Sequence, residues 1–307
     1  MFIKNNLSWI NVTIACKCLT VTRSAYYDWI NGEAIRLERK RTKQALLKLI
    51  KIEHLKSKKR YGSTKIIKAL KSQGIKHNHK AIEKLMRDNG IRSIVNKKYK
   101  ATTNSKHTLD VFENVLDRQF NVAKPNYAWV SDITYIATNE GWLYLATVLD
   151  LYSNKIIGYA MSDRINKQLV IDALNKALKA RNYPTGVIVH SDRGSQYASK
   201  AYKALLKRYK LIGSMSRKGN CWDNAVAENF FGIIKKEYIS QVKFITRNQA
   251  KLGIFDYIEA WYNPQRIHSK LGYLSPSEFE KSSINLSCNV VRKISKNVKI
   301  GAKSTQL

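Results

Sequence analysis

The order of strand-like and helix-like segments between residues 127 and 281 constrains the fold of this chain more than any other feature. Three β-rich runs come first, YAWVSDITYIAT, GWLYLATVLDLY and KIIGYAMS, and Asn139-Glu140-Gly141 between the first two is a strong hairpin signal. Helical and strand patterns then alternate over residues 167–180, 186–190, 199–210 and 211–215. This order predicts an α/β fold with a mixed five-stranded sheet flanked by helices.

A further helix is expected directly after this sheet, in the segment NCWDNAVAENFFGIIKKE that runs from Asn220 to Glu237. At about 100° per residue its side chains separate into two sides. One side gathers Val226, Phe230, Ile233 and Ile234, and the other gathers Asn224, Glu228, Phe231 and Lys235. Asp223 or Asn224 is expected to cap the first turn. Taken alone, the pattern also fits an ordinary amphipathic surface helix whose charges are solvated.

Three carboxylates stand at positions where a sheet fold can bring them together. Asp132 lies within the first expected strand, where an acid is costly to bury unless something pairs with it. Asp192 follows a short strand at its carboxyl end, where open α/β sheets usually keep their sites. Glu228 is on the expected helix, and Lys235 follows two turns later on the same side, well placed for a DNA phosphate. Taken singly, each acid fits a helix cap or a surface charge as well as a ligand.

Together the three acids predict a site for hard divalent cations, because carboxylate oxygens are ligands that Mg²⁺ and Mn²⁺ prefer. Two such ions about 3.5–4 Å apart suit in-line displacement at a phosphodiester, one at the attacking oxygen and one at the leaving oxygen. We therefore expect Asp132, Asp192 and Glu228 to be both the metal ligands and the catalytic residues. Gly194 is expected to let the backbone turn closely past Asp192.

The charge of the chain indicates a polyanionic partner. Its 55 lysines and arginines against 22 acids give a net charge of +33. DNA is the expected partner, since basic surfaces bind phosphates with release of counterions. A membrane is a poorer match, because the basic residues are spread along the chain and no apolar run reaches about 18 residues. Four scattered cysteines and the polar start MFIKNNLSWI predict a cytoplasmic protein without a disulfide framework.

Composition and patterning divide the chain into five expected segments. They are a short helical N-terminal segment (1–34), a helical region (35–94), a linker (95–126), the sheet-forming core (127–281) and a basic tail (282–307). In the helical region, two helices joined by a turn at Gly74 fit a helix-turn-helix DNA-binding unit, and an ordinary helical hairpin fits the same pattern. Arg60, Lys65 and Lys80 are its candidate DNA contacts.

Further DNA contacts are expected in two loops of the core. The loop before the helix that carries Glu228 has a composition able to grip phosphates and stack a base. Its candidates are Arg217, Lys218, Asn220 and Trp222. Trp222 fits packing under the helix start equally well. Arg266, in the segment NPQRIHSKL, is expected either to contact DNA or to close the core.

Four motifs carry a resemblance to a known family: WVSDITYI, HSDRGSQY, SMSRKGNCWDNAVAENFFGIIKKE and YNPQRIHSKLGYLSP. They closely resemble the DDE transposases of bacterial insertion sequences, specifically the catalytic second-frame (OrfB-type) subunit, which is related to retroviral integrases. The resemblance covers about residues 127–280, and RYGSTKI resembles the helix-turn-helix region of the same family. It implies an RNase H-like integrase core. Asp132, Asp192 and Glu228 match its metal-binding triad, and Lys235 matches a basic residue seven positions after the Glu.

The resemblance also implies what the chain does. It implies Mg²⁺-dependent cleavage at insertion-sequence ends followed by strand transfer, with terminal repeats and target DNA as partners and a homo-multimer assembled on the bacterial nucleoid. Family members are often made as a fusion with a smaller upstream-frame protein, which is a possible partner. The zinc-binding region of the retroviral relatives is missing, so no zinc is expected. Two alternatives stay open: an inactive DNA-binding regulator of the element, and an RNase H-like nuclease that cuts without joining.

Overall fold

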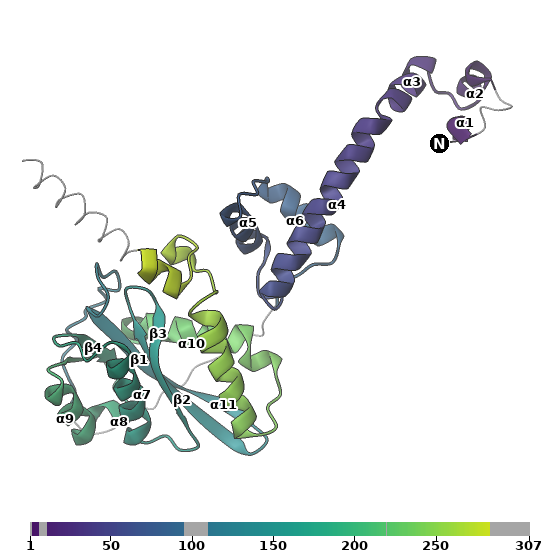
Figure 1. Cartoon of the computed structure of the whole chain (residues 1–307). Coiled ribbons are helices and arrows are strands. Elements are labelled where there is room, and N and C mark those ends of the chain that lie inside the picture. The colour runs from purple at the N-terminus through teal and green to yellow at the C-terminus, as the bar shows by residue number, and fades with distance from the viewer. Residues whose placement is uncertain (1, 6–10, 95–109, 219, 283–307) are drawn as a thin grey trace, which may run out of the picture. The chain divides into compact units, whose positions relative to one another are not determined.

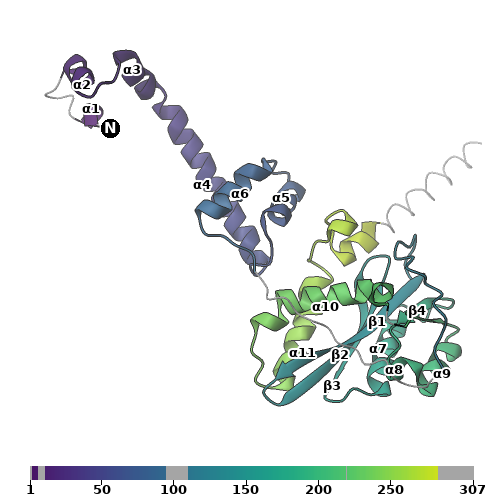
Figure 2. The same ribbon diagram turned by 180° about the vertical axis from the view of Figure 1, so that it is seen from behind.

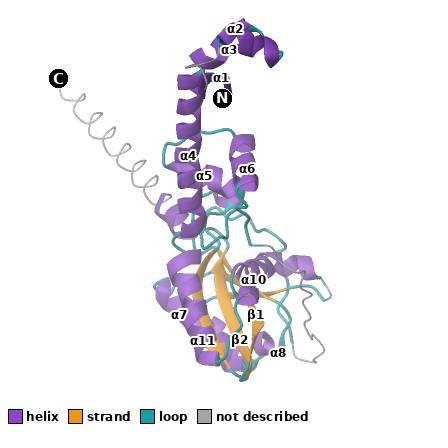
Figure 3. Cartoon of the chain, turned by 90° about the vertical axis from the view of Figure 1, so that its right-hand side faces the viewer, coloured by secondary structure: helices purple, strands orange, loops and turns teal. Residues whose placement is uncertain are grey.

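The structure is a computed structural model, and it describes residues 2–5, 11–94, 110–218 and 220–282 (Figure 1). By their contacts these residues divide into two compact units, Met1–Ser93 and Ile94–Leu307. The described part of the N-terminal unit is helical, and the described strands all belong to the second unit (Figure 3). Among the described residues there is no helix both long enough and apolar enough to cross a bilayer.

The described part of the N-terminal unit consists of helices and the turns between them from α2 onward. The helices are α1 (Phe2–Asn5), α2 (Val12–Cys18), α3 (Arg23–Asn31), α4 (Glu33–Lys56), α5 (Ser63–Ser72) and α6 (His79–Asp88). Asn11, Thr22 and Asn78 cap α2, α3 and α6 with side-chain oxygens that accept hydrogen bonds from first-turn N–H groups. These caps fix where the three helices begin.

Helices α4, α5 and α6 pack together around a small apolar core. Its buried side chains are Leu46, Ile50, Ile66, Leu70, Ile82, Leu85 and Met86. Gly74 and Gly90 follow α5 and α6 with φ of +81° and +65°, a left-handed backbone that glycine adopts without strain and that ends each helix. The helix-turn-helix type of region expected before the sheet is therefore confirmed.

The second unit is built on a sheet of five described strands. They are β1 (Ala128–Thr138), β2 (Gly141–Asp150), β3 (Lys155–Ser162), β4 (Ile188–Ser191) and β5 (Ile212–Met215). Their order across the sheet is β3-β2-β1-β4-β5. β1, β2 and β3 form an antiparallel meander, and β4 and β5 continue the sheet parallel to β1. The mixed five-stranded sheet expected from the sequence is confirmed.

One face of the sheet is covered by three helices. They are α7 (Lys167–Ala180), α8 (Ser195–Ala198) and α9 (Lys200–Arg208). Alternate side chains of β1 and β2, including Trp129 and Val148, pack with these helices into one core. α7 comes so close to β3 that a Cβ at Gly158 would lie 2.3 Å from the carbonyl oxygen of Ala173. A glycine is required at that crossing.

Two further helices contact the sheet at β1 and β2 (Figure 2). They are α10 (Ala225–Glu237) and α11 (Arg247–Asp256), and α11 continues as a π-helical turn over Tyr257–Tyr262. Phe230 of α10 meets Tyr262 edge to face, with ring centroids 4.8 Å apart. Thr246 caps α11 by accepting the N–H of Gln249 at 3.0 Å. α10 is thereby held between the sheet and the π-helical turn.

The segment 110–126 was expected to belong to a linker, and in the structure it lies against the sheet. Leu116 is buried, and its N–H donates to the Ser214 hydroxyl of β5 at 3.2 Å. Phe112 packs against the core under α7 and α9. The remaining linker residues, 95–109, and residues 283–307 of the expected tail lie outside the described residues.

Helical residues 276–282 close the described core against the β2–β3 turn. Glu280 accepts hydrogen bonds from the Ser153 hydroxyl at 2.7 Å and from Lys155 at 3.2 Å, and it pairs with Arg181. Arg181 also pairs with the buried Asp150 at 3.2 Å. Because these charges are largely buried and satisfied by one another, they fix how the end of the core sits on the sheet.

Candidate active site

Asp132 lies at the point of β1 where pairing with β4 ends, since β4 pairs with Ala128–Ser131. The hydroxyl of Ser131 lies 3.0 Å from the Tyr197 hydroxyl, so Ser131 points toward the face covered by α7–α9. Successive side chains of a strand point to opposite faces, so Asp132 points away from Tyr197. Asp132 is only 8% exposed, and its Oδ1 accepts the N–H of Ile133 at 2.8 Å.

Asp192 follows β4 directly, one strand away from Asp132. Its Oδ1 accepts the N–H of Gly194 at 2.9 Å, which holds the turn after the strand tightly against the carboxylate. A Cβ at position 194 would lie 3.0 Å from that same oxygen and 3.0 Å from Oε1 of Gln196. The expected role of Gly194 thus has a steric basis, because a larger residue would push the carboxylate aside.

Glu228 stands in the first turn of α10, and its side chain is exposed. The buried side of the helix consists of Ala227, Phe230, Phe231, Ile234 and Glu237. The expected polar position of Phe231 is wrong, because its ring is buried beside that of Phe230. A helix that packs against both the sheet and the π-helical turn buries more than one stripe. Glu228 remains on the side that the core does not cover.

The three acids interact electrostatically although they come from distant parts of the sequence. Burial and the negative charges of Asp192 and Glu228 raise the pKa of Asp132 well above its usual range. Partial burial and the charge of Asp192 likewise raise the pKa of Glu228. Both shifts disfavour the charged carboxylates, so an added cation near them would be favourable.

Lys235 is the basic residue that acts on this pocket. Its charge lowers the pKa of Asp132, against the effect of burial, and burial in turn lowers the pKa of Lys235 while Asp132 raises it. The Lys235 ammonium also lies 4.9 Å from the centre of the Tyr135 ring. Lys235 therefore interacts with both the Asp132 carboxylate and an aromatic face.

The three carboxylates differ in how ready they are to hold a metal ion. In the described residues, no three His, Cys, Asp or Glu side chains come close enough together to hold an ion. The pairs Asp132–Asp192, Asp132–Glu228 and Asp192–Glu228 are nevertheless close enough to repel one another. Glu228 is the most exposed of the three. Oxygen donors of this kind fit Mg²⁺ or Mn²⁺.

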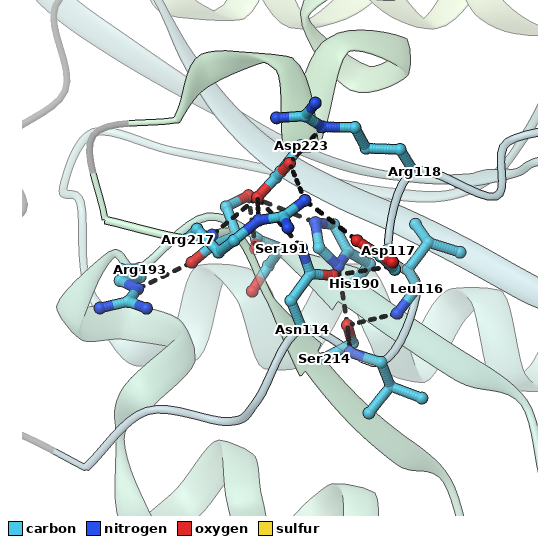
Figure 4. Close-up of polar contacts among 12 residues, drawn as sticks. Asn114, Leu116, Asp117, Arg118, His190, Ser191, Arg193, Ser214, Arg217 and Asp223 are labelled. Carbon is cyan, nitrogen blue, oxygen red and sulfur yellow. Dashed lines mark hydrogen bonds and ion pairs between the residues drawn. The ribbon is translucent and has the colours of Figure 1, made fainter.

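Asp223 anchors the loop that leads into α10 (Figure 4). The sequence did not indicate this role. Its side chain has no exposed surface. It accepts hydrogen bonds from the backbone N–H and Nε of Arg217 at 2.9 and 3.0 Å, from Nε of Arg118 at 2.7 Å and from Asn114 at 3.0 Å. The expected cap is therefore wrong: Asp223 binds these groups instead, and among the described residues Asn224 makes no side-chain cap bond.

His190 and two serines support the same loop from below (Figure 4). Nδ1 of His190 lies 2.9 Å from the Ser214 hydroxyl, and Nε2 lies 3.2 Å from the Ser216 hydroxyl. Burial lowers the pKa of His190 to about 4, so the ring is neutral at pH 7. Arg193, next to Asp192, donates from Nε to the Ser216 carbonyl at 2.7 Å. These bonds tie the turn after β4 to the loop after β5.

The loop expected to contact DNA carries its candidates in different settings. Trp222 is 70% exposed, which argues against packing under the helix start. Lys218 is exposed and Asn220 is half-buried. Arg217 is bound to Asp223 and, at 3.0 Å, to Asp117, yet its side chain keeps 48% of its surface exposed.

Arg266 lies in the core and is only 7% exposed. It donates from Nε and Nη2 to the Glu237 carboxylate of α10 at 3.0 and 2.8 Å. Tyr257 donates to the same carboxylate at 2.9 Å. Of its two expected roles, this placement favours closing the core over contacting DNA, because a buried paired guanidinium has little surface left for a phosphate.

The candidate contacts of the N-terminal unit lie on separate elements. Arg60 is half-buried in the turn after α4, and Lys65 on α5 places its ammonium 5.0 Å from the Tyr61 ring. Lys80 is exposed in the first turn of α6.

Sequence alone gave no sign of Arg118 and Asn114, because they lie about a hundred residues before the loop they stabilise.

Comparisons with known proteins agree with the motifs. Two family models, each described as an integrase core domain, match residues 122–221 and 228–284, and one described as an HTH-like domain matches residues 41–99. Transposase InsF for insertion sequence IS3A of Escherichia coli (strain K12) is 40% identical over 284 residues, 92% of this chain and 99% of the relative. The insertion element IS600 uncharacterized 31 kDa protein of Shigella sonnei is 41% identical over 266 residues, 87% of this chain and 97% of the relative.

Solved structures show a more distant likeness. A chain of the simian T-cell lymphotropic virus intasome in complex with PP2A regulatory subunit B56 gamma matches with a TM-score of 0.45 and 16% identity, over 70% of each chain. The HTLV-2 integrase catalytic core domain in complex with magnesium matches with a TM-score of 0.40 and 16% identity, over 51% of this chain and 97% of that one. The sequence matches decide the assignment: the chain belongs to the family of insertion-sequence transposases that contain an integrase core domain.

Proposed function

We propose that this chain is a DNA transposase that cuts DNA at the ends of an insertion sequence and joins those ends to target DNA. The observation that carries the proposal is the pocket in which burial and mutual repulsion raise the pKa of Asp132 and Glu228, with Asp192 acting on both. A transposase core has use for such a pocket, because phosphoryl transfer requires positive charge beside the phosphodiester, and the three acids would gather it there.

Asp132, Asp192 and Glu228 would hold the divalent cations, two in number, with Mg²⁺ or Mn²⁺ as the fitting ions. When bound, these ions stabilise charge on the attacking and leaving oxygens of the phosphodiester. Asp132 and Asp192 come from adjacent strands and are held by backbone N–H groups, so their positions are set in advance. Glu228, on the first turn of α10, would close the set by rotating its exposed side chain.

The remaining residues of the site bind and orient DNA. Lys235 lies next to Asp132 and would hold the phosphate that follows the reacting one. Trp222 and Lys218 project from the loop before α10 and would contact the DNA strand there. Arg217, half exposed and fixed by Asp223, would contact a phosphate with its free edge.

The partners follow from this reaction. The helix-turn-helix region, through Arg60, Lys65 and Lys80, would bind the terminal repeats, and strand transfer requires paired ends and therefore a homo-multimer on DNA. An upstream-frame protein would add end recognition. The place of action would be the cytoplasm of a bacterium, at the nucleoid.

One experiment tests the proposal against its alternatives. The purified chain is incubated with Mg²⁺ and a DNA fragment bearing the terminal repeats of its own element, and products are resolved on a denaturing gel. Cutting followed by joining is the expected result. Cutting alone would identify a nuclease, and binding without cutting would identify a regulator.

The variant Asp192→Asn is expected to bind the fragment and to lose both cutting and joining. Its matched control is Asp172→Asn, which removes an exposed carboxylate of α7 that is bonded to Gln168 outside the site. Replacing Mg²⁺ with EDTA should abolish the reaction of the wild type. Cutting by Asp192→Asn at the wild-type rate would refute the assignment of the triad.

A further inference from the structure

A cavity of about 650 Å³ lies between the end of the β1–β2 hairpin and the segment that follows α10. Lys235, which acts electrostatically on Asp132, is part of its lining. That volume falls within the range of about 300–1,000 Å³ typical of sites for small organic groups. The residues of its lining that matter here are Tyr135, Thr138, Trp142, Lys235, Lys243 and Phe244.

One wall of the cavity is aromatic. Trp142 is 50% exposed although it is one of the most apolar side chains of the unit. Its ring meets that of Tyr135 edge to face, with centroids 5.0 Å apart and an interplanar angle of 86°. This contact fixes the orientation of both rings, and an exposed, oriented indole face is a surface on which a nucleic-acid base can stack.

The charge of the cavity suits an anion. The described residues that line it include Lys235 and Lys243, and no Asp or Glu is among them. Lys235 reaches the Tyr135 ring on one side and acts electrostatically on Asp132 on the other, so the cavity adjoins the catalytic carboxylates. A ligand with an aromatic part and a negative charge matches this combination.

The hairpin that carries Trp142 is held in place by its surroundings. Arg247, at the start of α11, donates from Nε to the Trp142 carbonyl at 3.1 Å and from its backbone N–H to Glu140 at 2.8 Å. The N–H of Asn139 donates to the Phe244 carbonyl at 3.1 Å, across the cavity floor. The aromatic wall is therefore preorganised, which reduces the entropy lost on binding.

We propose that this cavity binds one unpaired nucleotide of a DNA strand, with the base against Trp142 and Tyr135 and the backbone phosphate between Lys235 and Lys243. The inference rests on the proposed function and deepens it: the reacting DNA end is held with a nucleotide outside the double helix. Unpairing a nucleotide next to the cleavage point exposes the scissile phosphodiester to Asp132 and its neighbours, and stacking on Trp142 offsets the unpairing.

The test compares two fluorescent DNA probes in anisotropy titrations of the full chain with EDTA present, so that nothing is cut. One probe is a sixteen-base-pair duplex with a three-nucleotide single-stranded overhang, and the other is the same duplex with blunt ends. The ratio of their affinities cancels binding by the helix-turn-helix region. Stacking of one base contributes about 1–3 kcal/mol, so Trp142→Ala should lower the preference for the overhang about 5- to 150-fold.

Two further variants make the comparison specific. Trp142→Phe keeps an aromatic face and should retain more of the overhang preference than Trp142→Ala. Phe255→Ala removes another exposed aromatic ring, on α11 outside the cavity, and should leave the ratio within twofold of the wild type. Trp142 is half exposed, so these variants should keep the wild-type thermal transition, which is measured in parallel.

The proposal is overturned if Trp142→Ala leaves the ratio within twofold of the wild type, or if it weakens both probes equally. These results are separable from failure of the proposed function. A chain that prefers the overhang through Trp142 and yet cuts no DNA keeps the nucleotide site and loses the transposase assignment. If the wild type cuts and joins DNA while Trp142→Ala has the same affinity ratio as the wild type, the transposase assignment stands and the nucleotide site is refuted.

Discussion

Asp223→Asn gives the sharpest test of how the loop before α10 is held. The carboxylate has no exposed surface. It accepts charge-assisted hydrogen bonds from two arginines and a further hydrogen bond from the side-chain amide of Asn114. An asparagine of the same shape keeps one acceptor and turns an N–H₂ group toward guanidinium donors. At least two charge-assisted bonds are then lost, at about 1.5–3 kcal/mol each.

The arginines limit the loss. The side chains of Arg217 and Arg118 are 48% and 44% exposed, so both guanidiniums recover hydration when Asp223 releases them. We therefore expect a loss of about 3 kcal/mol in the free energy of unfolding at pH 7. For a unit of this size, that corresponds to a fall in Tm of about 6–12 °C.

The pH dependence has a definite sign. The hydrogen bonds from Arg217 hold the pKa of Asp223 below its ordinary value of 3.8, so its contribution is complete above that value and is lost as the pH falls below it. The difference between the wild type and Asp223→Asn should thus be the same at pH 7 and pH 5.

Urea unfolding, followed by circular dichroism and tryptophan fluorescence, measures the effect. Asp117→Asn is the matched control, because Asp117 pairs with the same Arg217 at 3.0 Å while 64% of its side chain is exposed. It should cost under about 0.5 kcal/mol. Equal losses for the two variants, or a loss under about 0.5 kcal/mol for Asp223→Asn, would show that the buried carboxylate does not anchor the loop.

Three further outcomes are expected. Burial and like charges raise the pKa of Asp132 and so destabilise its ionised form at pH 7, and Asp132→Asn should therefore stabilise the metal-free chain by about 0.5–2 kcal/mol. Added Mg²⁺ should raise the Tm of the wild type, measured by calorimetry, but not the Tm of this variant. His190 has a pKa of about 4 in the folded chain and an ordinary pKa of 6.5, so the free energy of unfolding should fall by about 2 kcal/mol when the pH is lowered from 8 to 5. Urea unfolding should show a smaller fall for His190→Asn. Gly158→Ala places a Cβ 2.3 Å from the Ala173 carbonyl and should cost about 1–3 kcal/mol, whereas a Tm equal to the wild type would mean that α7 shifts freely.

The elements with regular periodicity could be predicted from the sequence. The helix expected over residues 167–180 is α7, and the meander with its hairpin at Asn139-Glu140 is β1–β2, because alternation and helical spacing are local properties of the chain. The three acids were also singled out by local reasoning. A charged residue inside an apolar strand, as at Asp132, is costly to bury, and together with Asp192 and Glu228 it led to the prediction of a cation site.

What the sequence could not indicate depends on contacts between distant segments. Phe231 was placed opposite the apolar side because a helical wheel assumes one buried stripe, whereas in the structure its ring is buried beside that of Phe230. Asp223 looked like a helix cap, since an acid before a helix usually is one, but Arg118 and Asn114 compete for it from residues far upstream. Leu116 belongs to the segment expected as a linker, and no sequence pattern identifies Ser214, far along the chain, as the group that its N–H contacts.

The difference in length between β1 and β4 determines where the backbone pairing beside Asp132 ends. β1 has eleven residues and β4 has four, so their pairing stops at Ser131, and among the described residues the next bridge on that edge joins Thr138 to Phe244. An interrupted strand edge ordinarily invites an unwanted neighbour. Here the interruption begins with Asp132, so the first residue of β1 beyond the pairing with β4 is an acid. A β4 two residues longer would draw Asp192 into the strand pairing and remove the turn in which its carboxylate accepts the N–H of Gly194.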